Sequence, residues 1–211
     1  MTAMSVIDQL ACSLGRRDEV PKQELARRLA EAKDRGGITE IAQNLWSKDK
    51  AVRADCIKVL YEVGYLEPGL IAPYAVDFLK LLRSRENRLV WGGMIALSTI
   101  GALAADELFP HVEEIQKAME GGSVITNDAG VLALAGIASA KEAYNQVIFP
   151  FLLDHLQHCR PKDVPQHAEK SAGAVNRENK QEFISVLEKR LEDLQGPQVK
   201  RVEKVIRQVR E

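Results

Sequence analysis

Three prolines recur along the chain at nearly the same interval and in similar apolar frames. The frames are Leu70-Ile71-Ala72-Pro73, Glu107-Leu108-Phe109-Pro110 and Val147-Ile148-Phe149-Pro150, so the prolines are 37 and 40 residues apart. A period of about 20–50 residues indicates one supersecondary unit stacked many times, with function on the surface that the units form together. The spacing therefore predicts an elongated repeat array rather than a compact globule.

A second self-similarity indicates that each unit contains two helices. The segment Met94–Gly101 aligns with Val131–Ala138 at an offset of 37 residues, and Gly64 precedes Gly101 by the same 37. We therefore predict an all-α fold, an α-solenoid, as a single domain of six helix pairs at roughly 1–36, 37–69, 70–106, 107–146, 147–181 and 182–211. Glycines are expected to end helices with positive φ, and each repeated proline to bend the first helix of its pair.

Composition and charge fit packed helices and narrow the choice of partners. Hydrophobic residues make up 45% of the chain and aromatic residues only 5%. Lys and Arg number 29 against 30 Asp and Glu, so no excess positive charge attracts nucleic acid or anionic lipid. No signal peptide or membrane span is expected. Three separated cysteines, Cys12, Cys56 and Cys159, are typical of thiols in a reduced compartment, which predicts a cytoplasmic protein.

The second pair carries a family resemblance. Asp49 in its turn, followed by Val52-Arg53 and a Leu60-x-x-x-Gly64 ending, resembles a HEAT repeat, as do the pairs with the repeated prolines. The resemblance implies a right-handed α-α superhelix of HEAT-like (armadillo-like) pairs, whose second helices line an inner, concave face. The pattern departs at the positions aligned with Arg53, which hold Val90, Asn127 and Pro165, and the turn acid recurs only as Glu86. Apolar packing is therefore expected to hold the central repeats.

The second helices in the middle of the array have few charges and many small residues. Residues 89–101 contain no charged side chain, and residues 124–138 contain only Asp128. Small residues allow either close packing of helices, which we favour, or a shallow groove for a partner helix.

Trp91 and Asp128 occupy equivalent repeat positions, 37 residues apart, and should lie side by side on adjacent helices. The ring would provide contact area for a partner and the carboxylate would pair with a cation. Alternatively, Trp91 belongs to the core and Asp128 caps a helix start. The predicted partner-binding residues are Trp91, Met94, Ser98, Asn127, Asp128, Val131 and Ala135.

One cluster of histidines has the residue types of a metal site. His155 and Cys159 are four residues apart on one helix, and His167 begins the next helix, so a zinc site is geometrically conceivable. Against it, Cys159 continues a buried apolar series, as free cysteines commonly do. No paired CxxC or HExxH motif is present. We therefore predict no metal and no cofactor, and retain these three residues as weak candidates.

The chain lacks G-x-S-x-G, P-loop and G-x-G-x-x-G motifs. The leading hypothesis is a non-enzymatic scaffold or adaptor that binds a protein or peptide, without a membrane, nucleic acid or required metal. The alternative is a DNA-binding protein or alkylpurine DNA glycosylase, because Trp91 with Asp128 is similar to part of the site in HEAT-like glycosylases. It ranks second because the central second helices supply one acid and no base, while DNA binding needs several cations.

Overall fold

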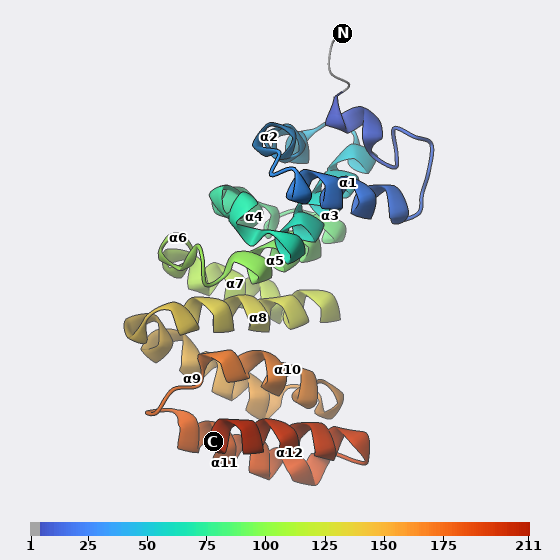
Figure 1. The fold of residues 1–211 in the computed structure, drawn as a ribbon. Helices are drawn as coiled ribbons and strands as arrows, with labels where there is room; N and C mark the ends of the chain where they lie inside the picture. Colours follow the sequence, from blue (N-terminus) through green and yellow to red (C-terminus); the bar gives the residue numbers. More distant parts are fainter. Residues whose placement is uncertain (1–4) are drawn as a thin grey trace.

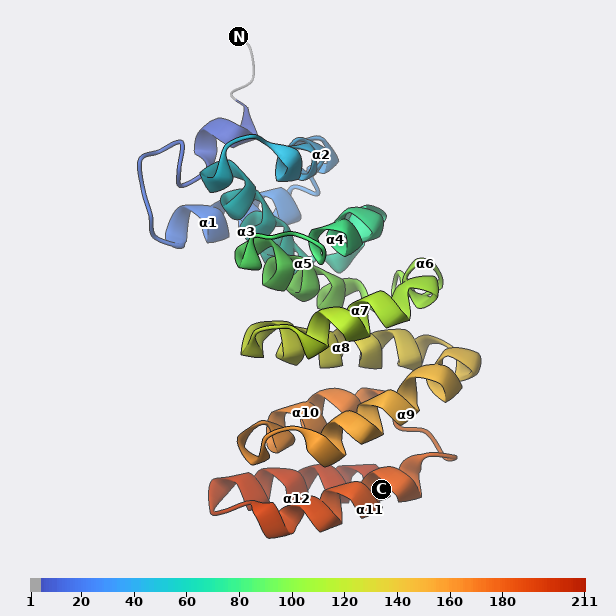
Figure 2. The same cartoon turned by 180° about the vertical axis from the view of Figure 1, so that it is seen from behind.

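The computed structural model describes residues 5–211 as an elongated stack of helices with the N-terminus at one end and the C-terminal helices at the other (Figures 1 and 2). The described residues contain no β-strand, which confirms the all-α prediction. One continuous group of buried apolar side chains runs along the stack from Val6 to Ile206. The core is therefore extended along the array, as repeat stacking requires.

Twelve α-helices and eight short 3-10 turns make up the described chain. The α-helices are α1 (Val20–Glu31), α2 (Arg35–Gln43), α3 (Lys50–Leu66), α4 (Ala75–Leu81), α5 (Asn87–Ile100), α6 (Ala105–Leu108), α7 (Val112–Glu120), α8 (Val124–Ala140), α9 (Glu142–His158), α10 (Val164–Ser171), α11 (Lys180–Arg190) and α12 (Pro197–Arg210). The 3-10 turns are η1 (Val6–Gln9), η2 (Asn44–Trp46), η3 (Pro68–Leu70), η4 (Ala72–Tyr74), η5 (Phe109–His111), η6 (Pro161–Asp163), η7 (Ala172–Ala174) and η8 (Leu191–Asp193).

The helices form two layers. In Figure 1, α8, α10 and α12 lie in front, whereas α7, α9 and α11 lie in front in the reverse view of Figure 2. Among the second helices of the pairs, α3 packs on α5, α5 on α8, α8 on α10 and α10 on α12. We call the face formed by these five second helices the inner face.

The expected pairs correspond to α2/α3, α4/α5, α6–α7/α8, α9/α10 and α11/α12, preceded by η1 and α1. Residues 1–4 of the first expected pair lie outside the described residues. The fifth pair begins at Glu142, before the expected boundary at 147. Lys141 has extended φ and ψ of −148° and 144°, which ends α8 and lets α9 start immediately.

The repeated prolines act differently from our expectation. Pro73 and Pro110 lie in η4 and η5, just before α4 and α7, and only Pro150 lies inside an α-helix, α9. The expectation that each proline bends a continuous first helix is therefore wrong at two of three sites. Proline lacks the N–H that the α-helical ladder needs, so the chain changes there to a 3-10 turn.

Gly64 and Gly101, which recur with the repeat, lack the expected positive φ. Among the described glycines only Gly15 and Gly196 have positive φ; Gly64 lies inside α3, and Gly101 follows α5 with φ −49°. Our expectation of positive φ at Gly64 and Gly101 is therefore wrong. A Cβ atom on Gly101 would lie 2.7 Å from the carbonyl oxygen of Ala133, so glycine allows α5 and α8 to approach closely.

We expect Gly101→Ala to lower the free energy of unfolding by about 1–3 kcal/mol, because the added methyl group meets backbone that cannot rotate away. Gly121→Ala is the matched control, since nothing lies within 4 Å of a Cβ atom at Gly121. Urea unfolding followed by circular dichroism measures both. Equal stability of the two variants would contradict the close contact.

Candidate functional site

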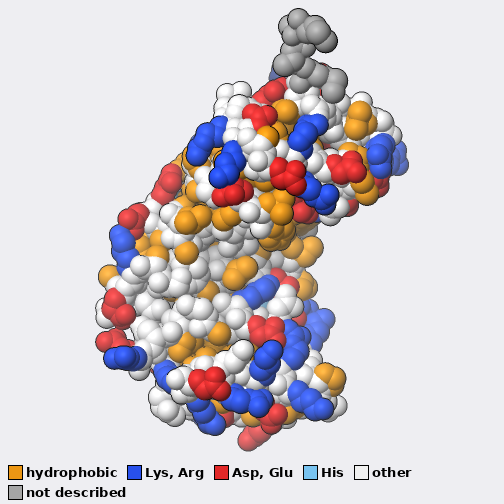
Figure 3. Space-filling view, in the orientation of Figure 1, with side chains coloured by type: hydrophobic (Ala, Val, Ile, Leu, Met, Phe, Trp, Pro, Cys, Tyr) orange, Lys and Arg blue, Asp and Glu red, His pale blue; other side chains and the backbone are white. Residues whose placement is uncertain are grey.

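The middle of the inner face carries few charges. In Figure 3, charged side chains gather near both ends of this face, and the surface between them is mostly uncharged. This distribution agrees with the lack of charged residues over 89–101 and the single acid over 124–138. Any partner that binds the middle of this face therefore meets mainly apolar and neutral groups.

Three aromatic rings form a cluster on the inner face, which we call the aromatic cluster: Tyr61 and Tyr65 of α3 and Trp91 of α5. The centroid of the Tyr61 ring lies 6.0 Å from that of Tyr65 and 6.2 Å from that of Trp91. Tyr65 is 58% exposed, Trp91 is half-buried and Tyr61 is buried. Arg88 lies over the Trp91 ring at 5.8 Å, and Lys58 over the Tyr61 ring at 4.8 Å. The cluster presents aromatic area beside two cations.

Aliphatic side chains continue this surface across α5 and α8. Ile95, one helical turn after Trp91, is half-buried, and Leu132 of α8 is 38% exposed. Ser98 is also half-buried, and its hydroxyl donates to the Ile95 carbonyl oxygen at 2.7 Å. The surface therefore offers apolar contact area, and the Ser98 hydroxyl beside it already has a hydrogen-bond acceptor.

Three residues predicted to contact a partner are in the core. Met94 and Val131 have no exposed surface, and Ala135 is 3% exposed. This placement corrects the prediction that they face solvent, because the rotation of α5 and α8 turns them toward neighbouring helices. Glycines and alanines of α5 and α8 also lie in the core. Those buried in the structure are Gly92, Gly93, Ala96, Ala129, Gly130 and Ala133, so they serve close packing.

Asn127 stabilises the junction of α7 and α8. Its side-chain nitrogen donates to the carbonyl oxygens of Met119 at 3.0 Å and Ser123 at 3.2 Å. The Met119 oxygen lies in the last turn of α7, where carbonyl oxygens lack α-helical partners. The Ser123 oxygen also accepts the first hydrogen bond of α8, from the Asn127 N–H at 3.0 Å. Asn127 thus has a local structural task that explains its half-buried position.

Asp128 connects α8 to α10. One carboxylate oxygen accepts from Gln166 Nε2 at 2.6 Å and the other lies 2.8 Å from His167 Nε2; Lys170 Nζ donates to the Asp128 carbonyl oxygen at 2.9 Å. Ser123, not Asp128, caps α8 by accepting from the Thr126 N–H. The carboxylate is thus engaged with α10, whereas Trp91 contacts the aromatic cluster. Trp91 and Asp128 therefore contact different neighbours, and their joint binding of a partner stays a prediction.

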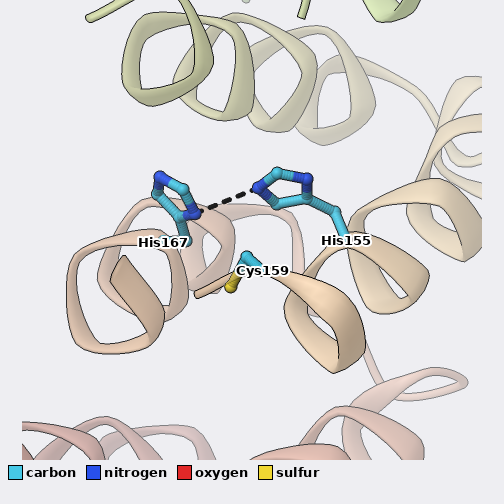
Figure 4. Close-up of side chains that lie close together, drawn as sticks. All are labelled: His155, Cys159 and His167. Atoms are coloured by element: carbon cyan, nitrogen blue, oxygen red, sulfur yellow. Dashed lines mark hydrogen bonds between the residues drawn. The ribbon is translucent and has the colours of Figure 1, made fainter. Parts of the chain in front are cut away.

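The candidate metal residues do come together (Figure 4). The ligand atoms of His155, Cys159 and His167 all lie within 4.8 Å of one another, and His155 Nε2 is 3.0 Å from His167 Nδ1. They line a cavity of about 270 Å³ that also touches Asn127 and Asp163.

Burial controls the protonation of this cluster. It lowers the pKa of His155 to about 4, with the neighbouring His167 as a second cause. Burial also lowers the pKa of His167, against the opposing hydrogen bond to Asp128. The pKa of the Cys159 thiol rises to about 11, again through burial. At neutral pH the cluster therefore holds two neutral imidazoles and a thiol.

The sequence patterns did not indicate Tyr65, Ile95 and Leu132 as surface residues, or Tyr61 as the buried member of the aromatic cluster. One signal was available, because Tyr61 and Tyr65 are four residues apart and therefore share a face of α3. The cross-helix contact between Tyr61 and Trp91 had no such signal, since the two residues are 30 apart and do not follow the period of 37.

The fold is that of an armadillo/HEAT-like α-solenoid, and solved structures share it over nearly the whole chain. An engineered protein has a TM-score of 0.69 at 20% identity, over 98% of this chain and 97% of its own. A designed armadillo repeat protein in complex with the peptide (KR)4 has a TM-score of 0.70 at 17% identity, over 90% of this chain and 87% of its own. Kap121p bound to Pho4p has a TM-score of 0.63 at 16% identity, over 88% of this chain and 21% of its own.

Neither a protein-family model nor a curated protein sequence matches the chain. The likeness to the solved structures therefore concerns the fold. Within residues 5–211, every helix is too short or too polar to cross a membrane.

Proposed function

We propose that this chain is a non-enzymatic scaffold or adaptor that binds a protein or peptide through the inner face, centred on Trp91. The observation that carries the proposal is the aromatic cluster. It lies beside half-exposed aliphatic side chains of α5 and α8, two helices with one charged residue each, Arg88 and Asp128. Tryptophan and tyrosine are, with arginine, the side chains enriched among the residues that dominate binding energy at protein interfaces. Apolar surface at the centre with charged groups at the ends matches the usual anatomy of such interfaces.

The architecture supports the same proposal. The solved relatives in fold include one structure with the peptide (KR)4 and one with Pho4p bound. A solenoid presents an extended face on which a segment of a partner can lie across several repeats. We propose that this partner contributes an apolar side chain to the surface of Trp91, Ile95 and Leu132. Ser98 would lie at the edge of the same contact.

Two chemical properties of the chain support the proposed cell compartment and class of partner. Cys12, Cys56 and Cys159 are free thiols, which supports the proposed cytoplasmic location. The balance of 29 basic and 30 acidic residues does not favour nucleic acid as a partner. The glycosylase alternative receives no support from Asp128, whose carboxylate oxygens face Gln166 and His167.

We expect Trp91→Ala to weaken binding of a partner peptide by about 2 kcal/mol or more, roughly 30-fold, because it removes the centre of the contact surface. A displayed random-peptide library selected against the full chain supplies the ligand, and calorimetry with the synthetic peptide gives its affinity. Trp46→Phe leaves Trp91 as the single tryptophan, so a shift in emission on peptide addition reports contact at this site.

Val76→Ala is the matched control, because Val76 lies on α4 of the other layer and is 40% exposed. Its affinity should equal that of the unmodified chain. Peptides whose affinity is unchanged by Trp91→Ala, or equally reduced by Val76→Ala, would show that the inner face is not the binding surface.

A further inference from the structure

We propose that His155, Cys159 and His167 form a binding site for a divalent transition-metal ion of the zinc class, with a fourth coordination position open to the adjacent cavity. The ligand atoms are His155 Nε2, Cys159 Sγ and His167 Nδ1 (Figure 4). Two imidazole nitrogens and one thiolate form a ligand set that suits Zn²⁺, and three protein ligands leave one position for water or another small ligand.

The spacing of the ligand atoms is close to that of a tetrahedral site. Bonds of about 2.0–2.1 Å to nitrogen and about 2.3 Å to sulfur separate neighbouring ligands by roughly 3.3–3.7 Å. The two ring nitrogens are 3.0 Å apart, and no pair in the group exceeds 4.8 Å. In Figure 4 the Cys159 sulfur points away from the two rings, so a change of the Cys159 rotamer, with smaller rotations of the rings, completes the geometry. The cavity of about 270 Å³ gives the ion a route from solvent and room for the fourth ligand.

Asp128 supplies an independent indication of a metal site. A carboxylate only accepts hydrogen bonds, so at 2.8 Å it fixes the proton of His167 on Nε2 and leaves the Nδ1 lone pair directed at His155. Metal-bound histidines almost always donate from their other ring nitrogen to a carboxylate, a backbone carbonyl or water, and Asp128 supplies the first of these. Gln166 holds the second oxygen of Asp128 at 2.6 Å. Asp128 is thus a positioning residue for His167.

The positions of the protons in the metal-free cluster determine which protons leave when the ion binds. Because His167 Nδ1 carries no proton, His155 Nε2 must donate the hydrogen bond between the rings. On metal binding, this proton is lost to solvent while His155 takes one up on Nδ1, and Cys159 releases its thiol proton to solvent. The ion then occupies the space between the three ligand atoms. Through Asp128, it also couples α8 to α9 and α10.

The test uses the full chain, freed of any histidine tag and of metal, titrated with Co²⁺ and Zn²⁺. We expect one Co²⁺ ion per chain, a thiolate-to-cobalt charge-transfer band, tetrahedral ligand-field bands, and displacement by Zn²⁺. Cys159→Ser should abolish the charge-transfer band. Asp128→Asn should weaken Zn²⁺ binding about 10–100-fold, as removal of a carboxylate behind a ligand does elsewhere.

His158→Gln is the matched control, because this exposed histidine lines the same cavity but lies outside the ligand group. Its spectrum and affinity should be unchanged. Circular dichroism of the metal-free variants identifies any that fail to fold. Absence of saturable one-to-one binding to the unmodified chain, or a charge-transfer band that persists in folded Cys159→Ser, would overturn the proposal and leave a hydrogen-bonded histidine pair.

Discussion

Replacing Asp55 by alanine is expected to lower the free energy of unfolding by about 3–5 kcal/mol. Asp55 of α3 is buried and lies 3.5 Å from Nζ of Lys22 of α1, which is 2% exposed. Its other oxygen accepts from the Cys12 backbone N–H at 2.8 Å. Without Asp55, Lys22 keeps only the partly exposed Glu19 as a partner, at 3.0 Å. A buried cation that loses a partner is costly, and so is the orphaned N–H. Urea unfolding followed by circular dichroism measures the loss.

Glu188→Ala is the control for Asp55→Ala, because it removes an ion pair with Arg210 that is exposed on both sides. We expect a change below about 1 kcal/mol there. The double variant Lys22→Met/Asp55→Leu should recover much of the loss, since it removes both charges together. A loss below about 1 kcal/mol for Asp55→Ala would mean that the N-terminal helix does not depend on this pair.

Replacing Arg190 by methionine is expected to lower the free energy of unfolding by about 2–4 kcal/mol, because several buried carbonyl groups lose their donor. Arg190 of α11 is 8% exposed, and its guanidinium donates to the carbonyl oxygens of Leu156 at 2.8 Å and Cys159 at 2.9 Å. These groups lie at the C-terminal end of α9, where carbonyls lack helical partners and a cation is favourable. Methionine keeps most of the apolar stem and none of the donors.

Two further variants make the Arg190 measurement specific. Arg190→Lys should give an intermediate loss, because an ammonium keeps the charge but not the planar fork of donors. Lys189→Met changes an exposed neighbour and should stay within about 0.5 kcal/mol of the unmodified chain. Thermal and urea unfolding compare all three. Equal stability of Arg190→Met and Lys189→Met would show that water satisfies the end of α9.

The candidate site was only partly predictable from the chain. The residue types alone indicated the low charge of the central second helices and made Trp91 a candidate contact residue. Met94, Val131 and Ala135 were misplaced, because successive residues of a helix point about 100° apart and a small rotation exchanges exposed for buried positions. The rotation of a helix is set by the packing of its neighbours. Sequence spacing alone leaves it open.

The sequence by itself determined the solenoid, because the repeated proline frames and helical periodicity are local properties that recur in each unit. It also marked His155, Cys159 and His167 through their types and proximity along the chain. Only the tertiary structure showed that Asp128 contacts His167 instead of capping α8. It also showed that Gly101 allows close packing of α5 on α8. Both depend on the approach of helices from different repeats, which is fixed when the whole core packs.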